Sequence, residues 1–267
     1  PPPTPHAHSV RRALTHLDSL HKAIKGFGDP QPYDMLRTFH EDGQGYSVIL
    51  HPLRSIAKEQ EEIAVLIGDI AFNARAALDH ATYEMAVSDT ANLSRRKRRQ
   101  VLFDVQFPVY TKDTRFDGDG PDCISMLTAP HHALIRSLQP FAHEYARPLA
   151  DLHAINNQDK HRIVHVVGVQ PTNFRTDFTP ANATDGLRIA MTYGSGLITE
   201  HDTEFVSVRF SEKFSVEDMA MDGREWRLSA QICFDSASNR VGGEIAGIKM
   251  FDIVVAVNWA LSKIENE

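Results

Sequence analysis

The chain has 267 residues, of which 42% are hydrophobic, and a formal net charge of −7. This apolar share is enough to fill a sizeable core, so intrinsic disorder is excluded as the general state of the chain. The acidic balance argues against a protein that coats nucleic acid along its whole surface. Two cysteines are too few for a disulfide framework and lack metal-ligand spacing, which favours a reducing, cytoplasmic setting.

We expect neither a targeting signal nor a membrane span. Residues 1–9 lack the basic start and apolar centre of a signal peptide, and we expect them to form a tail. The most apolar stretch, residues 248–264, is short for a bilayer span and contains Lys249 and Asp252. The sequence therefore predicts a buried helix there and no membrane partner.

The first part of the chain combines helical periodicity with a hairpin signal. Apolar residues recur at helical spacing from Val10 to Ile24, with Ser9 as the expected N-cap. Two short strands around a glycine-containing turn predict a β-hairpin over about 35–51. A long alanine-rich helix is expected from about Ser55 to about Val87, and its small side chains predict close approach of another helix, as in a homodimer.

The second part changes from helical to strand patterns. Residues 88–130 are expected to be irregular, and shorter helices follow at about 129–138 and about 147–162. A final helix is expected at about 245–264. Between the helix at about 147–162 and the final helix, four segments are rich in β-branched residues or alternate in polarity. They predict an antiparallel sheet of at least four strands, at 163–169, 187–193, 205–210 and 226–234.

These patterns together predict an α+β fold. A tail at 1–9 precedes a helical bundle at 10–162, which contains the hairpin. An antiparallel β region at 163–240 and a C-terminal helix at 241–267, packed on the bundle, complete the chain. We expect these parts to form one integrated domain.

Two helical segments carry more polar residues than packing requires. On the first, Arg75 and Asp79 form an i,i+4 pair. On the second, 156–162, Asn156 and Asp159 lie on the apolar side, where buried polar groups must find partners. Four further polar residues of the first segment share one side at a period of 3.6 residues: Asp69, Asn73, His80 and Glu84.

The sequence contains four short blocks: GDxxxNxRxALDH at 68–80, QFP at 106–108, LQP at 138–140 and NxDKHR at 157–162. Together these blocks resemble a widespread family of uncharacterised bacterial proteins. The resemblance covers most of residues 60–165, and it implies no particular activity. The chain departs from that family at Ala74 and Ala76, where the family usually has Leu and Ser.

One hypothesis for these polar residues is a structural latch. Arg75 and Asp79 on one helix would pair with Asp159 and Arg162 on the other, and would fix the register between the two helices. Under this hypothesis the chain is a non-enzymatic interaction or structural module.

A second hypothesis is metal-independent RNA cleavage. The spacing Arg75-x4-His80 resembles the R-x4–6-H pattern of HEPN ribonucleases, and Tyr83 is close to the aromatic residue that some of them place after the histidine. The resemblance implies that Arg75 stabilises the charge developing on the phosphate and that His80 transfers the proton, with no cofactor. Ala76 departs from the polar residue that usually follows the arginine. The supporting residues are expected to be Asp79, His161 and Arg162.

A third hypothesis is a metal-dependent hydrolase with ligands on the two polar helices. Against it, neither helix has an E-x-x-H pair, and Lys160 would repel a cation. The candidate ligands are Asp69, His80, Glu84, Asp159 and His161.

The basic run Arg95-Arg96-Lys97-Arg98-Arg99 is the candidate surface for an RNA backbone. The alternative is a solvated loop, which the net charge of −7 favours. We take an RNA-binding protein or HEPN-like ribonuclease as the leading hypothesis, with the interaction module and the metal-dependent hydrolase as alternatives.

Overall fold

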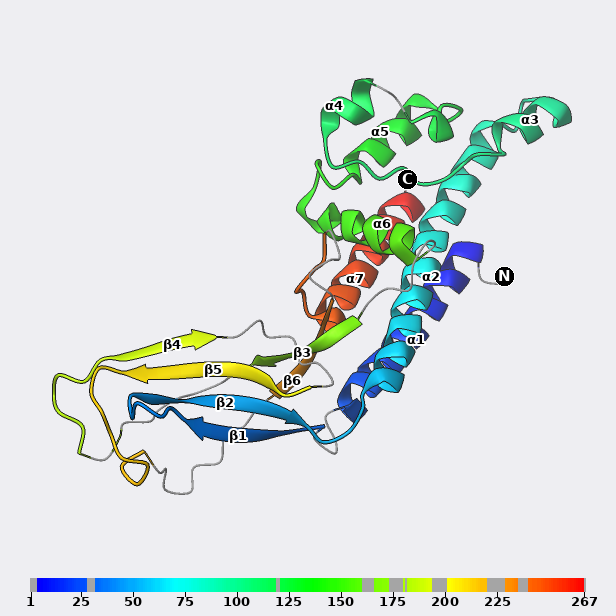
Figure 1. Cartoon of the computed structure of the whole chain (residues 1–267). Coiled ribbons are helices and arrows are strands. Elements are labelled where there is room, and N and C mark those ends of the chain that lie inside the picture. Colours follow the sequence, from blue (N-terminus) through cyan, green and yellow to red (C-terminus); the bar gives the residue numbers. More distant parts are fainter. Residues whose placement is uncertain are drawn as a thin grey trace.

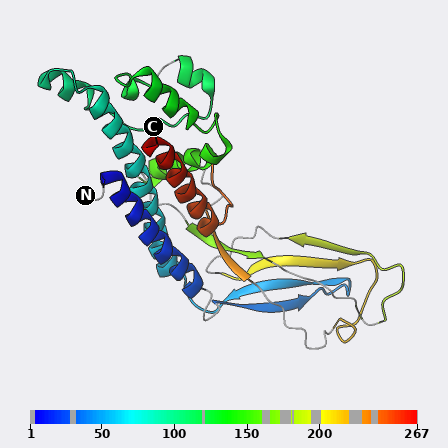
Figure 2. The same cartoon turned by 180° about the vertical axis from the view of Figure 1, so that it is seen from behind.

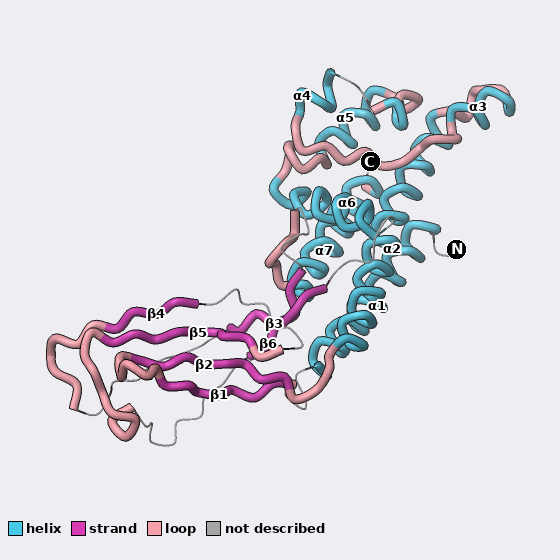
Figure 3. The backbone as a smooth tube through the Cα atoms, viewed as in Figure 1, coloured by secondary structure: helices cyan, strands magenta, loops and turns pink. Residues whose placement is uncertain are grey.

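The protein has a body of helices and an elongated sheet that extends from one end of it, as the two opposite views show (Figure 1, Figure 2). The computed structural model describes residues 4–27, 32–118, 121–159, 166–172, 180, 182–193, 201–219, 229–234 and 240–266. The predicted α+β class is confirmed: helices and antiparallel strands occupy separate regions (Figure 3).

The helical body is built on two long helices that lie side by side and run in opposite directions (Figure 1). They are α1 (Pro5–Phe27) and α2 (Ala57–Asp89), and α2 is about 50 Å long. The expectation that residues 1–9 form a tail is wrong for its second half, because α1 begins at Pro5 rather than after Ser9. Proline suits the first turn of a helix, and the buried His6 anchors this turn to Glu84 and Glu265 at 3.0 and 2.8 Å.

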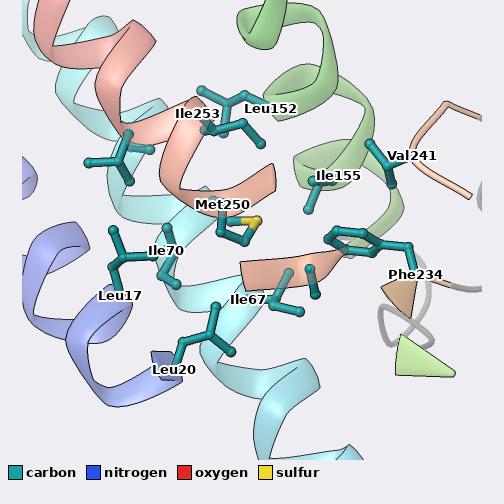
Figure 4. Close-up of a cluster of buried hydrophobic side chains, with 14 of the residues drawn as sticks. Leu17, Leu20, Ile67, Ile70, Leu152, Ile155, Phe234, Val241, Met250 and Ile253 are labelled. Atoms are coloured by element: carbon teal, nitrogen blue, oxygen red, sulfur yellow. The ribbon is translucent and has the colours of Figure 1, made fainter. Parts of the chain in front are cut away.

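Two further helices, α6 (Arg147–Asp159) and α7 (Ala246–Glu265), close the core around α2. Figure 4 shows side chains of α1, α2, α6 and α7 meeting Phe234 and Val241 in one apolar cluster. The predicted C-terminal helix is thus present and is packed on α1, α2 and α6.

Residues 88–130, expected to be irregular, contain short helices instead. These are α3 (Arg95–Val101), α4 (Asp113–Gly118) and the 3-10 turn η1 (Asp122–Ile124), followed by α5 (Ala129–Ser137) and a second 3-10 turn, η2 (Glu144–Ala146). Arginine, lysine and glutamine are good helix formers, which explains why the basic run is helical. Asp89 joins α2 to the start of α5, accepting bonds from the Thr128 amide (2.7 Å) and the His131 ring (2.9 Å).

The predicted hairpin forms, with β1 (Tyr33–Phe39) and β2 (Gly45–Pro52) as its strands. It does not belong to the helical bundle as expected, because β2 also pairs with β5 (Thr203–Phe210), which pairs with β4 (Ile189–Tyr193). The sheet order is therefore β1-β2-β5-β4. The other two strands, β3 (Val166–Thr172) and β6 (Ser229–Phe234), form a separate antiparallel pair, so residues 163–240 do not make one sheet by themselves.

Gly45 permits the contact between β2 and β5. Its φ is +150°, and a Cβ at this position would lie 1.9 Å from the Val208 carbonyl oxygen. We expect Gly45→Ala to lower the free energy of unfolding by more than about 2 kcal/mol, because the methyl group displaces the backbone of β5. At about 2–4 °C per kcal/mol, the melting temperature should fall by at least about 4 °C.

The matched control is Gly26→Ala, where no atom lies within 4 Å of the new Cβ. Because Gly26 lies in α1, this variant should be as stable as the native chain or up to about 1 kcal/mol more stable. An unchanged melting temperature in Gly45→Ala would contradict the pairing of β2 with β5.

Candidate functional site

Arg75 and Asp79 hold an irregular segment against α2. The Arg75 Nε donates to Asp79 Oδ2 at 3.1 Å, and its Nη2 donates to the Phe107 carbonyl oxygen at 2.6 Å. The Phe107 amide in turn donates to Asp79 Oδ1 at 2.8 Å. Both backbone polar groups of Phe107 are therefore satisfied by one ion pair, which permits its ring to be fully buried.

Gln139 completes this arrangement from the end of α5. Its buried side-chain amide donates to the Pro108 and Ile135 carbonyl oxygens, each at 3.0 Å, and accepts the Tyr110 amide at 2.9 Å. We call Arg75, Asp79 and Gln139, with the backbone of residues 107–110, the Phe107 clamp. It unites three of the four sequence blocks in one structural contact.

The predicted Arg75–Asp79 pair binds the backbone of Phe107, a partner that the sequence did not indicate. The side chains of Asp159, His161 and Arg162 lie outside the described residues, so the expected partner pair is not placed. Near the clamp, burial raises the pKa of the Cys123 thiol, which favours the protonated form over a nucleophilic thiolate.

His80 lies on a different side of α2 from Arg75. Five residues of α-helix separate the two side chains by about 140° around the axis. His80 is exposed, whereas only 11% of the Arg75 side chain is accessible. Within one chain, the two residues of the R-x4-H pattern are therefore not brought together around one phosphate.

The predicted metal ligands are also spread over different neighbours. The carboxylate of Asp69 lies 3.9 Å from the His16 ring, and Glu84 contacts His6 at 3.0 Å. Among the residues that the structure describes, no three histidine, cysteine or acidic side chains gather in a group suited to a metal ion. The other two candidate ligands, Asp159 and His161, have side chains outside the described part of the chain.

The basic run contributes three of its five residues to a hollow of about 740 Å³ at the junction of α2 and α3. We call this hollow the α2–α3 groove. Arg96 and Lys97 do not line it, because they point about 100° and 200° away from Arg95 around α3. The lining residues are Tyr83, Val87, Arg95, Arg98, Arg99, Leu102 and Phe103.

Arg98 fixes α3 in place, while Arg95 and Arg99 remain exposed. The Arg98 Nη2 donates to the Val87 carbonyl oxygen at 2.9 Å, near the end of α2, where carbonyl groups lack helical partners. Arg95 and Arg99 are both exposed to solvent. The groove therefore presents the accessible guanidinium groups of Arg95 and Arg99, while Arg98 attaches α3 to the end of α2.

Two aromatic side chains of the α2–α3 groove were not among the predicted site residues. Phe103 is 84% exposed and Tyr83 is 43% exposed. An aromatic residue that directly follows a basic run was a usable signal for Phe103. Nothing in the local pattern indicates that Tyr83, twelve residues before Arg95, lines the same groove.

Comparisons with protein-family models, with curated proteins and with solved structures give no match. In the part of the chain that the structure describes, none of the helices combines the length and apolar character that crossing a bilayer requires.

The Phe107 clamp can be tested with a double-mutant cycle of Arg75→Ala and Asp79→Ala. We expect each single variant to lose about 2–4 kcal/mol in the free energy of unfolding, because Arg75→Ala leaves the carbonyl oxygen of buried Phe107 unpaired and Asp79→Ala leaves its amide unpaired. The coupling between them should be about 1–2 kcal/mol, measured by urea denaturation.

The control cycle uses Asp18 and Lys22, a pair with the same i,i+4 spacing whose side chains are 66% and 76% exposed. These variants should change stability by no more than about 0.5 kcal/mol. Equal effects in the two cycles would show that the clamp does not stabilise the fold.

His80→Ala should leave the melting temperature within about 2 °C of the native value, because the side chain is exposed to solvent. Differential scanning calorimetry of the two proteins measures this directly. A fall of about 10 °C would instead make His80 part of the structural latch.

Proposed function

We propose that this protein binds RNA and holds the sugar-phosphate backbone in the α2–α3 groove. The observation that supports this proposal is that Arg95, Arg98 and Arg99 gather in one groove of about 740 Å³. Guanidinium groups bind phosphate through paired hydrogen bonds and displace condensed counterions, which supplies most of the affinity for nucleic acid.

The overall charge of −7 does not conflict with this proposal, because attraction depends on the local charge. Between residues 94 and 104 there are five cationic side chains and one carboxylate, Asp104. Figure 1 shows α3 at the far end of α2, away from the sheet, so the basic surface projects from the body. We further propose a cytoplasmic location, where an RNA ligand is present.

Binding is a better-supported role than cleavage. Arg75 donates to Phe107 and Asp79 within the chain and lies on another side of α2 from His80. One observation still favours cleavage as a second candidate: His80 is exposed and lies one helical turn from Tyr83, which lines the groove. We expect binding without cleavage; cleavage that persists in EDTA and disappears in His80→Ala would make the protein a ribonuclease.

The expected homodimer is not required by this proposal. The alanines that predicted it, including Ala71, Ala74 and Ala77, are no more than 1% exposed and pack inside the chain. They bring the protein's own helices close together, so they are not available to a second copy.

The proposal is tested by fluorescence anisotropy with a labelled RNA of mixed sequence, using the double variant Arg95→Glu/Arg99→Glu. Each phosphate contact with a single strand raises the association constant about fivefold between 1 M and 0.1 M salt. We therefore expect the loss of two contacts to lower the affinity at least about twentyfold at about 0.1 M salt. The slope of log K against log salt should decrease in magnitude by about 1.4.

The matched control, Arg96→Glu/Lys97→Glu, makes the same change of net charge on the same helix but outside the α2–α3 groove. We expect it to weaken binding only a few-fold, through the general field. Equal losses in the two variants would contradict a defined site, and native protein that does not bind RNA would overturn the proposal.

A further inference from the structure

The α2–α3 groove contains more than positive charge, because two accessible aromatic rings line it. Phe103 is the most exposed of the large hydrophobic side chains in the described structure, at 84%. It belongs to the same groove as Arg95 and Arg99, and Tyr83 on α2 contributes a second ring. Both rings are exposed to solvent, Phe103 more fully than Tyr83, so a ligand in the groove can reach them.

We infer that the α2–α3 groove recognises single-stranded rather than double-stranded RNA, with Phe103 and Tyr83 stacking on unpaired bases; this inference depends on the proposed function. Bases in a duplex are stacked on their neighbours, and the major groove of A-form RNA is too deep and narrow for side chains to read. An unpaired base offers its whole face to an aromatic ring.

The arginines and the aromatic residues of the groove would contact different parts of the RNA, the backbone and the bases. Arg95 and Arg99 provide exposed positive charge for the phosphates, which attracts any nucleic acid. Phe103 and Tyr83 provide flat apolar surfaces, which favour strands whose bases are free. Because every base has a stacking face, the expected recognition tolerates different sequences.

A basic surface with an exposed phenylalanine is also found on proteins that bind anionic membranes. A strand is favoured here, because three arginines and two aromatic rings share one open hollow, where phosphates and bases of the same strand can both find partners. A flexible single strand can enter such a hollow, whereas a bilayer surface is nearly flat. Membrane binding is therefore an outcome that the experiment must be able to detect.

The experiment compares one unstructured RNA of about 20 nucleotides with the same strand annealed to its complement, using native protein, Phe103→Ala and Phe72→Ala. Phe72 is the matched control, because it is also an exposed phenylalanine, at 62%, and it does not line the groove. Both substitutions are at exposed positions, and circular dichroism verifies that each variant is folded.

We expect the native protein to bind the single strand at least about tenfold more tightly than the duplex. Phe103→Ala should weaken single-strand binding about tenfold and leave duplex binding within about twofold, because stacking contributes only when bases are free. Phe72→Ala should change neither affinity. The same pattern, reduced in size, is expected for Tyr83→Leu.

Equal affinities for single strand and duplex, both unchanged in Phe103→Ala, would overturn the stacking inference and leave the proposed function standing. Absence of binding to either RNA would overturn both. Vesicles of phosphatidylserine and phosphatidylcholine provide the last comparison. Vesicle binding that Phe103→Ala abolishes, without RNA binding, would overturn both proposals in favour of a membrane surface.

Discussion

The buried side of α2 is the constraint on which the rest of the helical body depends. Small residues occupy much of this side, and four of them, Ala71, Ala74, Ala77 and Ala81, are at most 2% exposed. Because alanine adds little width to a helix, α1, α6 and α7 can all approach α2 closely. The opposite side of the same helix keeps Val65, Phe72 and Tyr83 in solvent. One helix thus organises the core and carries part of the candidate site.

Buried and half-buried polar side chains attach the irregular segments to this framework. The chain between α3 and α4 has no ladder of its own, so its backbone groups need partners from elsewhere. The Phe107 clamp supplies partners for Phe107, Pro108 and Tyr110 in this segment. In the same way, Asp89 accepts the Thr128 amide just before α5. Arg75 therefore stabilises the fold, whereas the exposed His80 takes no part in the Phe107 clamp. The two residues of the R-x4-H pattern thus have different roles.

The direction of α3 determines what the basic run can do. Arg98 donates to a carbonyl near the end of α2, which turns α3 so that Arg95 and Arg99 lie beside Tyr83 and Phe103. The same seven residues in an extended loop would present five separate charges to solvent. The chain as a whole is acidic, yet residues 94–104 carry five cationic side chains and one carboxylate. Local geometry, rather than composition, makes the groove a candidate for an RNA ligand.

The sequence by itself determined helices α1, α2, α5, α6 and α7, the hairpin and the Arg75–Asp79 pair, because periodicity, turn residues and i,i+4 spacing act over a few residues. Only the tertiary structure decided that β2 pairs with β5, more than 150 residues away, and that Arg75 binds the backbone of Phe107. It also decided that Tyr83 and Phe103 line one groove. These contacts depend on the path of the chain between the elements, and no local pattern encodes a path that packing of the whole core selects.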